Sequence, residues 1–175
     1  MAEEKVILVD KNDNQIGLMN KMEAHEKGAL HRAFSIFVFN SNGEFLIQQR
    51  ALSKYHSGGE WANTCCSHQR KGESTLEAAH RRLIEEMGFD VELDEVFNFT
   101  YKKEFGNGLT EHEFDHVVFG KFDGVPVPNP EEVASWKYVT LETLKNDIAL
   151  HPENYTIWLQ IALKEVEQHL QNQTL

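Results

Sequence analysis

The stretch ESTLEAAHRRLIEEMGF, residues 73–89, is the part of the chain that most directly decides the fold. Ser74 is a residue type that caps helix N-termini, and apolar residues then recur at helical spacing as far as Met87. Gly88 follows the last of them, at a position where glycine commonly ends a helix. The pattern predicts a helix over residues 74–87.

Two neighbouring carboxylates near the end of this helix point in different directions. At about 100° per residue, Glu86 lies on the edge of the apolar stripe, whereas Glu85 faces solvent. A carboxylate turned toward the core is costly unless it is paired or bound to a metal. Glu86 is therefore either one half of an ion pair with Arg81 or Arg82, or a metal ligand.

On either side of this helix the chain alternates between strand and turn patterns. Further helices are predicted from Leu141 and over residues 152–170, and residues 21–27 fit a helical turn or a loop equally well. Residues 51–71 are polar and irregular, and a loop of that length inside a compact domain is more often functional than idle. Strands flanked by helices predict an α+β fold with a mixed sheet, in a single domain over residues 1–175. The strands are expected at residues 6–9, 15–17, 33–40, 45–50, 91–104, 112–122 and 136–139.

The composition limits the classes of partner. A net charge of −11 argues against a general nucleic-acid binder, because such a protein presents a basic surface to the phosphate backbone. A small anionic substrate is compatible with this charge, since a few cations and a divalent metal can hold a diphosphate. Cys65 and Cys66 are adjacent and cannot form an ordinary structural disulfide, which predicts free thiols in a reducing compartment. Because no secretory signal or long apolar run is visible, we expect a soluble, cytoplasmic protein without membrane partners.

Three further groups of residues could carry chemistry. In an extended segment Cys66 and His68 point to the same side, which suits an acid or base beside a metal, although a buried cysteine can equally be a small hydrophobe. Strand alternation likewise places Glu111 and Glu113 on one face, where a cation lies between them, one of them is protonated, or the face is simply solvated. His25 and His31 form the third group. They lie in a polar segment, where surface histidines are common.

The helical segment and the residues before it resemble the Nudix box. That motif runs glycine, five residues, glutamate, seven residues, arginine, glutamate, an aliphatic residue, any residue, two glutamates, any residue and glycine. Ser67 stands for the first glycine, and Arg82 stands for a glutamate that helps bind metal in Nudix hydrolases. The resemblance therefore implies the Nudix fold, whereas Arg82 argues against ordinary hydrolase chemistry. The matching positions are Glu73, Arg81, Leu83, Glu85, Glu86 and Gly88.

Several motifs outside the box resemble, in the same order, the type I isopentenyl-diphosphate isomerase family, an unusual branch of the Nudix superfamily. The resemblance runs from about Val6 to Trp158, nearly the whole chain. It implies an α/β/α sandwich, in which a mixed sheet is flanked by helices. The motifs are His25, LHRAFS at 30–35, RALSK at 50–54, Trp61, NTCCSH at 63–68, EHE at 111–113 and Trp158.

The resemblance implies two metal sites. Three histidines and two glutamates hold one divalent ion, and such ligands suit manganese, zinc or iron. A second ion, magnesium, is shared between Glu86 and the diphosphate of the substrate. Lys21, Arg50 and Lys54 then bind the phosphates through charge-assisted hydrogen bonds. The implied ligands of the first ion are His25, His31, His68, Glu111 and Glu113.

The implied reaction is a 1,3 proton shift that interconverts isopentenyl diphosphate and dimethylallyl diphosphate. Cys66 and Glu113 are implied as acid and base, in either order. Tyr101 donates a hydrogen bond to one of them, and the ring face of Trp158 stabilises a carbocation. Trp158 is otherwise a core aromatic at helical spacing. Two rival functions are a Nudix hydrolase of a nucleoside diphosphate derivative and a catalytically silent Nudix-fold binding module.

Overall fold

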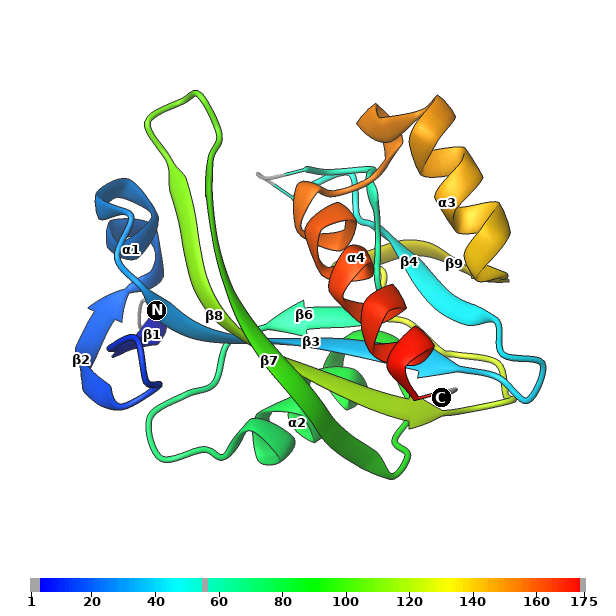
Figure 1. The fold of residues 1–175 in the computed structure, drawn as a ribbon, viewed down its shortest axis with the longest axis horizontal. Coiled ribbons are helices and arrows are strands. Elements are labelled where there is room, and N and C mark those ends of the chain that lie inside the picture. The colour runs from blue at the N-terminus through cyan, green and yellow to red at the C-terminus, as the bar shows by residue number, and fades with distance from the viewer. Residues whose placement is uncertain (1–3, 55–56, 174–175) are drawn as a thin grey trace.

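The computed structural model describes residues 4–54 and 57–173, which form a mixed sheet with helices on both faces (Figure 1). Within these residues the sheet has nine strands, and no helix has the length and apolar content needed to span a membrane. The strands are β1 (Lys5–Val9), β2 (Gln15–Asn20), β3 (His31–Phe39), β4 (Phe45–Arg50), β5 (Trp61–Ala62), β6 (Cys65–Ser67), β7 (Leu93–Glu104), β8 (Thr110–Lys121) and β9 (Val133–Val139). The helices are α1 (Lys21–Lys27), α2 (Thr75–Met87), α3 (Leu141–Leu150), the 3-10 helix η1 (Pro152–Asn154) and α4 (Ile157–Asn172).

β3 is the central strand of this sheet. It pairs in parallel with β8 along its whole length, from His31 beside Glu113 to Phe39 beside Lys121. Its other edge meets β1, β6 and β4 in turn, all of them antiparallel. A largely buried strand needs neighbours on both edges, because its backbone amides and carbonyls cannot reach water. β3 therefore joins the N-terminal hairpin of β1 and β2 to the rest of the sheet.

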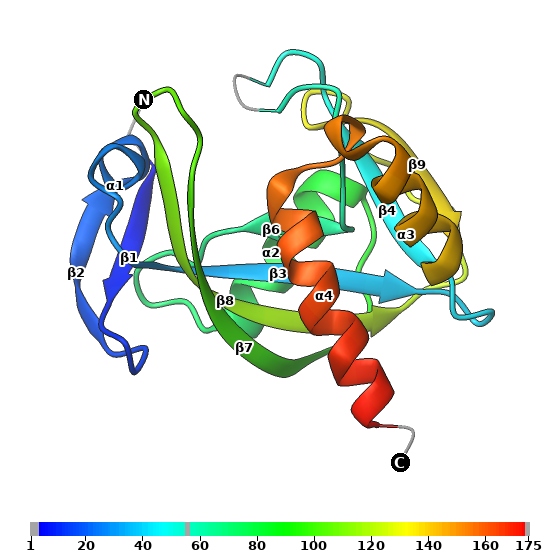
Figure 2. The same ribbon diagram turned by 45° about the horizontal axis from the view of Figure 1, so that its top comes forward.

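Helices cover both faces of the sheet, and an apolar core lies on each side. α2 packs on one face, where its Ala79 and Leu83 share a core with Phe34 of β3. α3 and α4 pack on the opposite face, where Leu144 and Leu159 belong to a second core. α4 lies across β3 and β8 on that side (Figure 2). The predicted α+β class and its α/β/α sandwich are confirmed.

The helix predicted over residues 74–87 is α2, and both of its ends have the expected features. Ser74 Oγ accepts a hydrogen bond from the backbone amide of Glu77 at 3.1 Å, while Glu77 Oε1 accepts one from the amide of Ser74 at 3.0 Å. Gly88 ends the helix with a φ of 71°, and a Cβ atom there would lie 2.1 Å from the carbonyl oxygen of Val127. Glycine is thus needed both for the left-handed backbone and for the close approach of the following loop.

Several element boundaries differ from those predicted. Residues 51–71 are not wholly irregular, because β5 pairs with β4 and β6 pairs with β3. Such short strands are set by long-range pairing and leave little local pattern. The last helix does not begin at Pro152 but at Ile157, where Thr156 Oγ1 accepts a hydrogen bond from the amide of Leu159 and so caps α4. Residues 21–27, for which the sequence left a helical turn and a loop open, form the helix α1.

Replacing Ser74 by alanine removes the reciprocal cap and should lower the free energy of unfolding by about 1 kcal/mol. Ser135→Ala, at an exposed serine of β9, is the matched control and should change it by less than about 0.5 kcal/mol. Urea denaturation followed by circular dichroism measures both values. Equal effects of the two substitutions would contradict the importance of the cap.

Candidate active site

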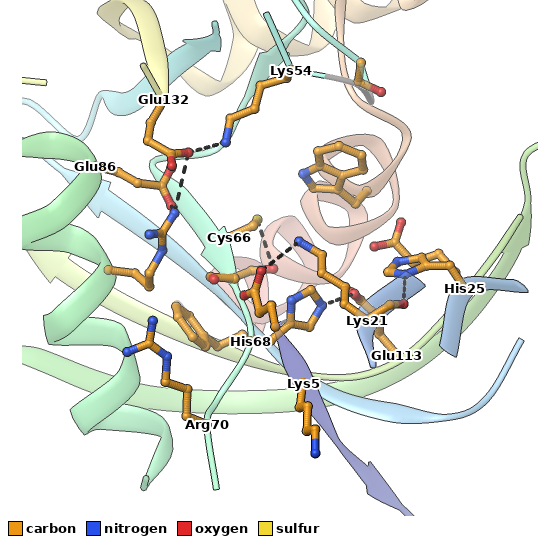
Figure 3. A pocket seen from close by; sticks show the side chains of 18 of the residues that line it. Lys5, Lys21, His25, Lys54, Cys66, His68, Arg70, Glu86, Glu113 and Glu132 are labelled. Atoms are coloured by element: carbon orange, nitrogen blue, oxygen red, sulfur yellow. Dashed lines mark hydrogen bonds and ion pairs between the residues drawn. The ribbon is translucent and has the colours of Figure 1, made fainter. Parts of the chain in front are cut away.

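A cavity of about 1070 Å³ lies between the N-terminal hairpin, α1, β6, α2, the β7–β8 turn and α4 (Figure 3). Most of the residues predicted to act at the site line it. His31 and Tyr101 do not, but both are buried and reach Glu113, which does. The predicted residues in its lining are Lys21, His25, Arg50, Lys54, Cys66, His68, Glu86, Glu111, Glu113 and Trp158.

Two histidines and one carboxylate converge in the wall of this cavity. His68 Nε2 lies 3.0 Å from Glu113 Oε2, and His31 Nε2 lies 3.3 Å from the same oxygen. Ligand atoms of the three residues all lie within 4.8 Å of one another. All three side chains are buried. Imidazoles gathered around a carboxylate are a donor set that binds divalent transition metals.

The backbone determines which nitrogen of two imidazole rings faces the cluster. Nδ1 of His31 lies 3.0 Å from the carbonyl oxygen of Ala29, and Nδ1 of His25 lies 2.7 Å from that of Lys21. A carbonyl can only accept, so each Nδ1 carries the hydrogen and each neutral ring keeps a lone pair on Nε2. Nε2 of His31 is buried without a hydrogen-bond partner in the described part of the chain. Burial also lowers the pKa of His68 to about 4. The rings thus have the form in which imidazole binds a metal.

His25 and Glu111 lie beside this cluster. The ring centroid of His25 is 5.5 Å from that of His31 and 6.5 Å from that of His68. Glu111 is buried and shares a face of β8 with Glu113. The interpretations of surface histidines and of a solvated strand face are therefore wrong. α1 and the N-terminal hairpin cover this end of β8, and that covering could not be read from a local pattern.

The two glutamates of β8 differ in their protonation. Burial, followed by the negative charge of Glu113, raises the pKa of Glu111 well above its usual range. Burial acts on Glu113 in the same direction, but the closeness of the His31 and His68 rings outweighs it and holds the pKa of Glu113 well below its usual range. Tyr101 donates a hydrogen bond to Glu113 Oε1 at 2.7 Å. Glu113 is therefore the ionised carboxylate of the pair.

The two adjacent cysteines serve different parts of the structure. Cys65 belongs to the core beneath α2, and its thiol lies 3.3 Å from Glu86 Oε2. Cys66 lines the cavity, and its Sγ lies 3.0 Å from Asn63 Oδ1 and 3.5 Å from Ser35 Oγ. Burial raises the pKa of the Cys66 thiol, so this group is neutral in the structure.

Glu86 confirms one of the two interpretations left open by the sequence. Its Oε2 lies 2.8 Å from a guanidinium nitrogen of Arg82, which confirms the ion pair. Arg82 also pairs with Glu85 and lies 3.6 Å from Glu132. Its guanidinium therefore lies among three glutamates, at the motif position where Nudix hydrolases have a metal-binding glutamate. Oε1 of Glu86 accepts a hydrogen bond from the Gln48 amide at 3.1 Å. A carboxylate oxygen can accept a second bond, so a magnesium ion at Glu86 stays a prediction.

The three cations predicted to bind phosphate, Lys21, Arg50 and Lys54, all reach the cavity. The guanidinium carbon of Arg50 lies 5.1 Å from the ring centroid of Trp158, and Lys54 pairs with Glu132 (Figure 3). Trp158 is half-buried and lines the cavity, so it is more than a core aromatic. These three cations and the ring of Trp158 therefore line the same cavity.

Four buried polar side chains around the site had no role assigned from the sequence. A polar residue within an otherwise apolar strand was the available signal for two of them, and a third continues the alternation of Glu111 and Glu113. Their importance comes from partners distant in the chain, which local patterns do not encode. These residues are Ser35, Gln48, Asn63 and Asp115.

Solved structures share this fold. A chain described as DR0079 from Deinococcus radiodurans is 23% identical with a TM-score of 0.77, and the match covers 93% of this chain and 98% of that one. The MutT protein from Methanosarcina mazei Go1 is 16% identical with a TM-score of 0.64, and the match covers 79% and 94%. At these identities the likeness establishes the fold alone.

The sequence comparisons go further. The NUDIX domain family matches residues 29–159. A curated relative, isopentenyl-diphosphate Delta-isomerase 2 from Aromatoleum aromaticum, is 56% identical over 164 residues, which cover 94% of this chain and 87% of the relative. Isopentenyl-diphosphate Delta-isomerase from Serratia proteamaculans is 51% identical, and the match covers 94% and 92%. The chain therefore belongs to the Nudix superfamily and, within it, to the isopentenyl-diphosphate Delta-isomerase family.

Proposed function

We propose that this chain interconverts isopentenyl diphosphate and dimethylallyl diphosphate by a metal-dependent 1,3 proton shift. The observation that carries the proposal is that a thiol, Cys66, and a carboxylate, Glu113, line one cavity together with Lys21, Arg50 and Lys54. The curated relatives named for this activity match over most of the chain. Such a cavity suits a substrate that is anionic at one end and hydrocarbon at the other.

A divalent transition metal would be held by His31, His68 and Glu113, with His25 and Glu111 as the further ligands. The neutral rings and the buried Nε2 atom of His31 fit such an ion. Manganese, zinc and iron all accept this mixture of imidazole and carboxylate. When bound, the metal supplies positive charge beside the two carboxylates, which favours their ionised forms.

The diphosphate would bind near Glu86, Arg50 and Lys54. Magnesium suits this place, because it prefers carboxylate oxygens together with the oxygens of a substrate phosphate. Lys54 now pairs with Glu132 and would exchange this partner for a phosphate oxygen. Lys21, on α1, would add a third cation from the opposite wall.

The hydrocarbon would lie between Cys66 and Glu113. One of these groups adds a proton to the terminal carbon of the double bond, which gives the neighbouring tertiary carbon carbocation character. The other removes a proton from the adjacent methylene, which forms the new double bond and leaves the composition unchanged. Tyr101 orients Glu113 through its hydrogen bond, and the ring face of Trp158 stabilises the cation by about 2 kcal/mol once water is excluded.

Cys66→Ala and Glu113→Gln should each lower kcat for isomerisation by at least about 100-fold, because each removes one of the two proton-transferring groups. Product formation and uptake of deuterium from heavy water measure the reaction. Glu104→Gln, at an exposed glutamate of β7, is the control and should keep wild-type turnover. Near wild-type turnover of either active-site variant would contradict the two-sided mechanism. Release of phosphate from nucleoside diphosphate derivatives as the main activity would instead favour the hydrolase.

His31→Ala should abolish retention of the transition metal, which the wild-type chain should hold at about one ion per molecule. The substitution removes one of the three converging ligands. Inductively coupled plasma mass spectrometry of the dialysed proteins measures the metal. The control His80→Ala removes a histidine that pairs with Asp90 on the outer side of α2, and it should bind metal normally. Activity that survives exhaustive chelation would count against the site.

Lys54→Ala should raise KM for isopentenyl diphosphate by about tenfold and change kcat less, since a lost charge-assisted bond to phosphate weakens substrate and transition state alike. Steady-state kinetics give both parameters. Lys164→Ala, at an exposed lysine of α4, serves as the control for the loss of one positive charge. An unchanged KM in Lys54→Ala would remove this residue from the phosphate site.

A further inference from the structure

We propose that Ser35 and Asn63 are positioning residues that hold the thiol of Cys66 in place for proton transfer, and that Asp115 fixes the Ser35 hydroxyl for this task. The inference deepens the proposed function, because it takes Cys66 as one of the two proton-transferring groups. Ser35, Asn63 and Asp115 are almost fully buried, with exposures of 4%, 1% and 2%. Buried polar groups of this kind need partners. The thiol of Cys66 is a partner of both Ser35 and Asn63, and Asp115 is the partner of Ser35.

The Asn63 amide can present only its oxygen to the sulfur. Its Nδ2 atom donates to the carbonyl oxygens of Ile36 at 3.0 Å and of Cys65 at 3.1 Å, which uses both amide hydrogens. A flipped amide would place its oxygen against those two carbonyls. Oδ1 is therefore directed at Cys66 Sγ, 3.0 Å away, and can only accept.

The Ser35 hydroxyl is also held as an acceptor. Its single hydrogen is donated to Asp115 Oδ2 at 2.7 Å. The lone pairs of Oγ remain, and Cys66 Sγ lies 3.5 Å from this atom, within the longer range of a hydrogen bond from sulfur. The pairing of β3 with β6 places Ser35 directly opposite Cys66, which keeps the two side chains together.

Two fixed oxygens thus face one thiol, whose single hydrogen can be donated to either of them, at 3.0 Å to Asn63 Oδ1 or at 3.5 Å to Ser35 Oγ. Both directions restrict the rotation of the Cys66 side chain. Proton transfer to or from carbon depends steeply on placement, and a displacement of about 1 Å can cost about 100-fold in rate. Ser35 itself lines the cavity, so the thiol is held at the surface that the hydrocarbon would touch. If Ser35 merely linked β3 to β6, it would stabilise the fold without controlling the position of the Cys66 thiol.

The test combines kinetics with the infrared S–H stretching band, which reports hydrogen bonding of a thiol. Ser35→Ala should shift the band that is missing in Cys66→Ala, because the thiol then has Asn63 Oδ1 as its one remaining acceptor, and it should leave the Cys65 band in place. It should also lower kcat roughly tenfold, as expected for one lost hydrogen bond, with KM within about twofold of wild type. The phosphate-binding residues lie elsewhere, which is why KM is spared.

Thr64→Val is the matched control for the loss of a buried hydroxyl. Thr64 Oγ1 donates to the carbonyl oxygen of Leu46 and accepts from the amide of Val38, so this change should lower the melting temperature but keep the Cys66 band and kcat per folded molecule. If an unpaired Asp115 makes Ser35→Ala unstable, Ser35→Ala/Asp115→Val removes both partners together, which is far less costly.

A folded Ser35 variant with the wild-type band, or with wild-type kcat, would overturn the proposal. Inactivity of the wild-type chain itself would be a failure of the proposed function, and the infrared measurement would still decide whether Ser35 holds the thiol. A shifted band together with reduced kcat and a preserved KM supports the positioning role.

Discussion

The parallel pairing of β3 with β8 is the constraint on which the rest of the structure depends. It places His31 directly beside Glu113, so the first two members of the histidine and glutamate cluster come from neighbouring strands and not from loops. Farther along, the same pairing runs between two apolar cores as far as Phe39 and Lys121. A slip of one residue would turn the buried apolar side chains to the wrong faces. The register that stabilises the fold therefore also determines the geometry of the site.

At one end of this pair the protein buries groups that water would otherwise solvate. The pKa of Glu113 is held low by its interactions with His31 and His68, while the pKa of Glu111 is raised by burial and by the charge of its neighbour. An ionised carboxylate is costly to bury without a compensating positive charge beside it. A divalent cation held by His31, His68 and Glu113 would supply that charge. The buried Nε2 atom of His31 points to the same explanation.

Strand alternation divides the two adjacent thiols between two tasks. Cys65 turns toward α2 and contacts Glu86, the carboxylate predicted to bind magnesium together with the diphosphate. Cys66 turns into the cavity, where Asn63 and Ser35 surround its sulfur. β6 has only three residues, yet it links the proposed proton chemistry to the proposed binding of the diphosphate. Small displacements of this strand would consequently affect both.

The sequence by itself determined the elements whose signals are local. The cap at Ser74, the apolar spacing of α2 and the stop at Gly88 depend on residues a few positions apart, and all three are present in the structure. The order of the motifs also identified the family, and ten of the twelve side chains predicted at the site line the cavity. Contacts between distant segments were decided only by the tertiary structure. His25 of α1 and His31 of β3 are buried where α1 contacts β8 and β1 contacts β3, and β6 forms because it pairs with β3. These features, like the partners of Glu86 and Cys66, depend on contacts between distant segments, and the free energy of such contacts is not encoded in any short stretch of the chain.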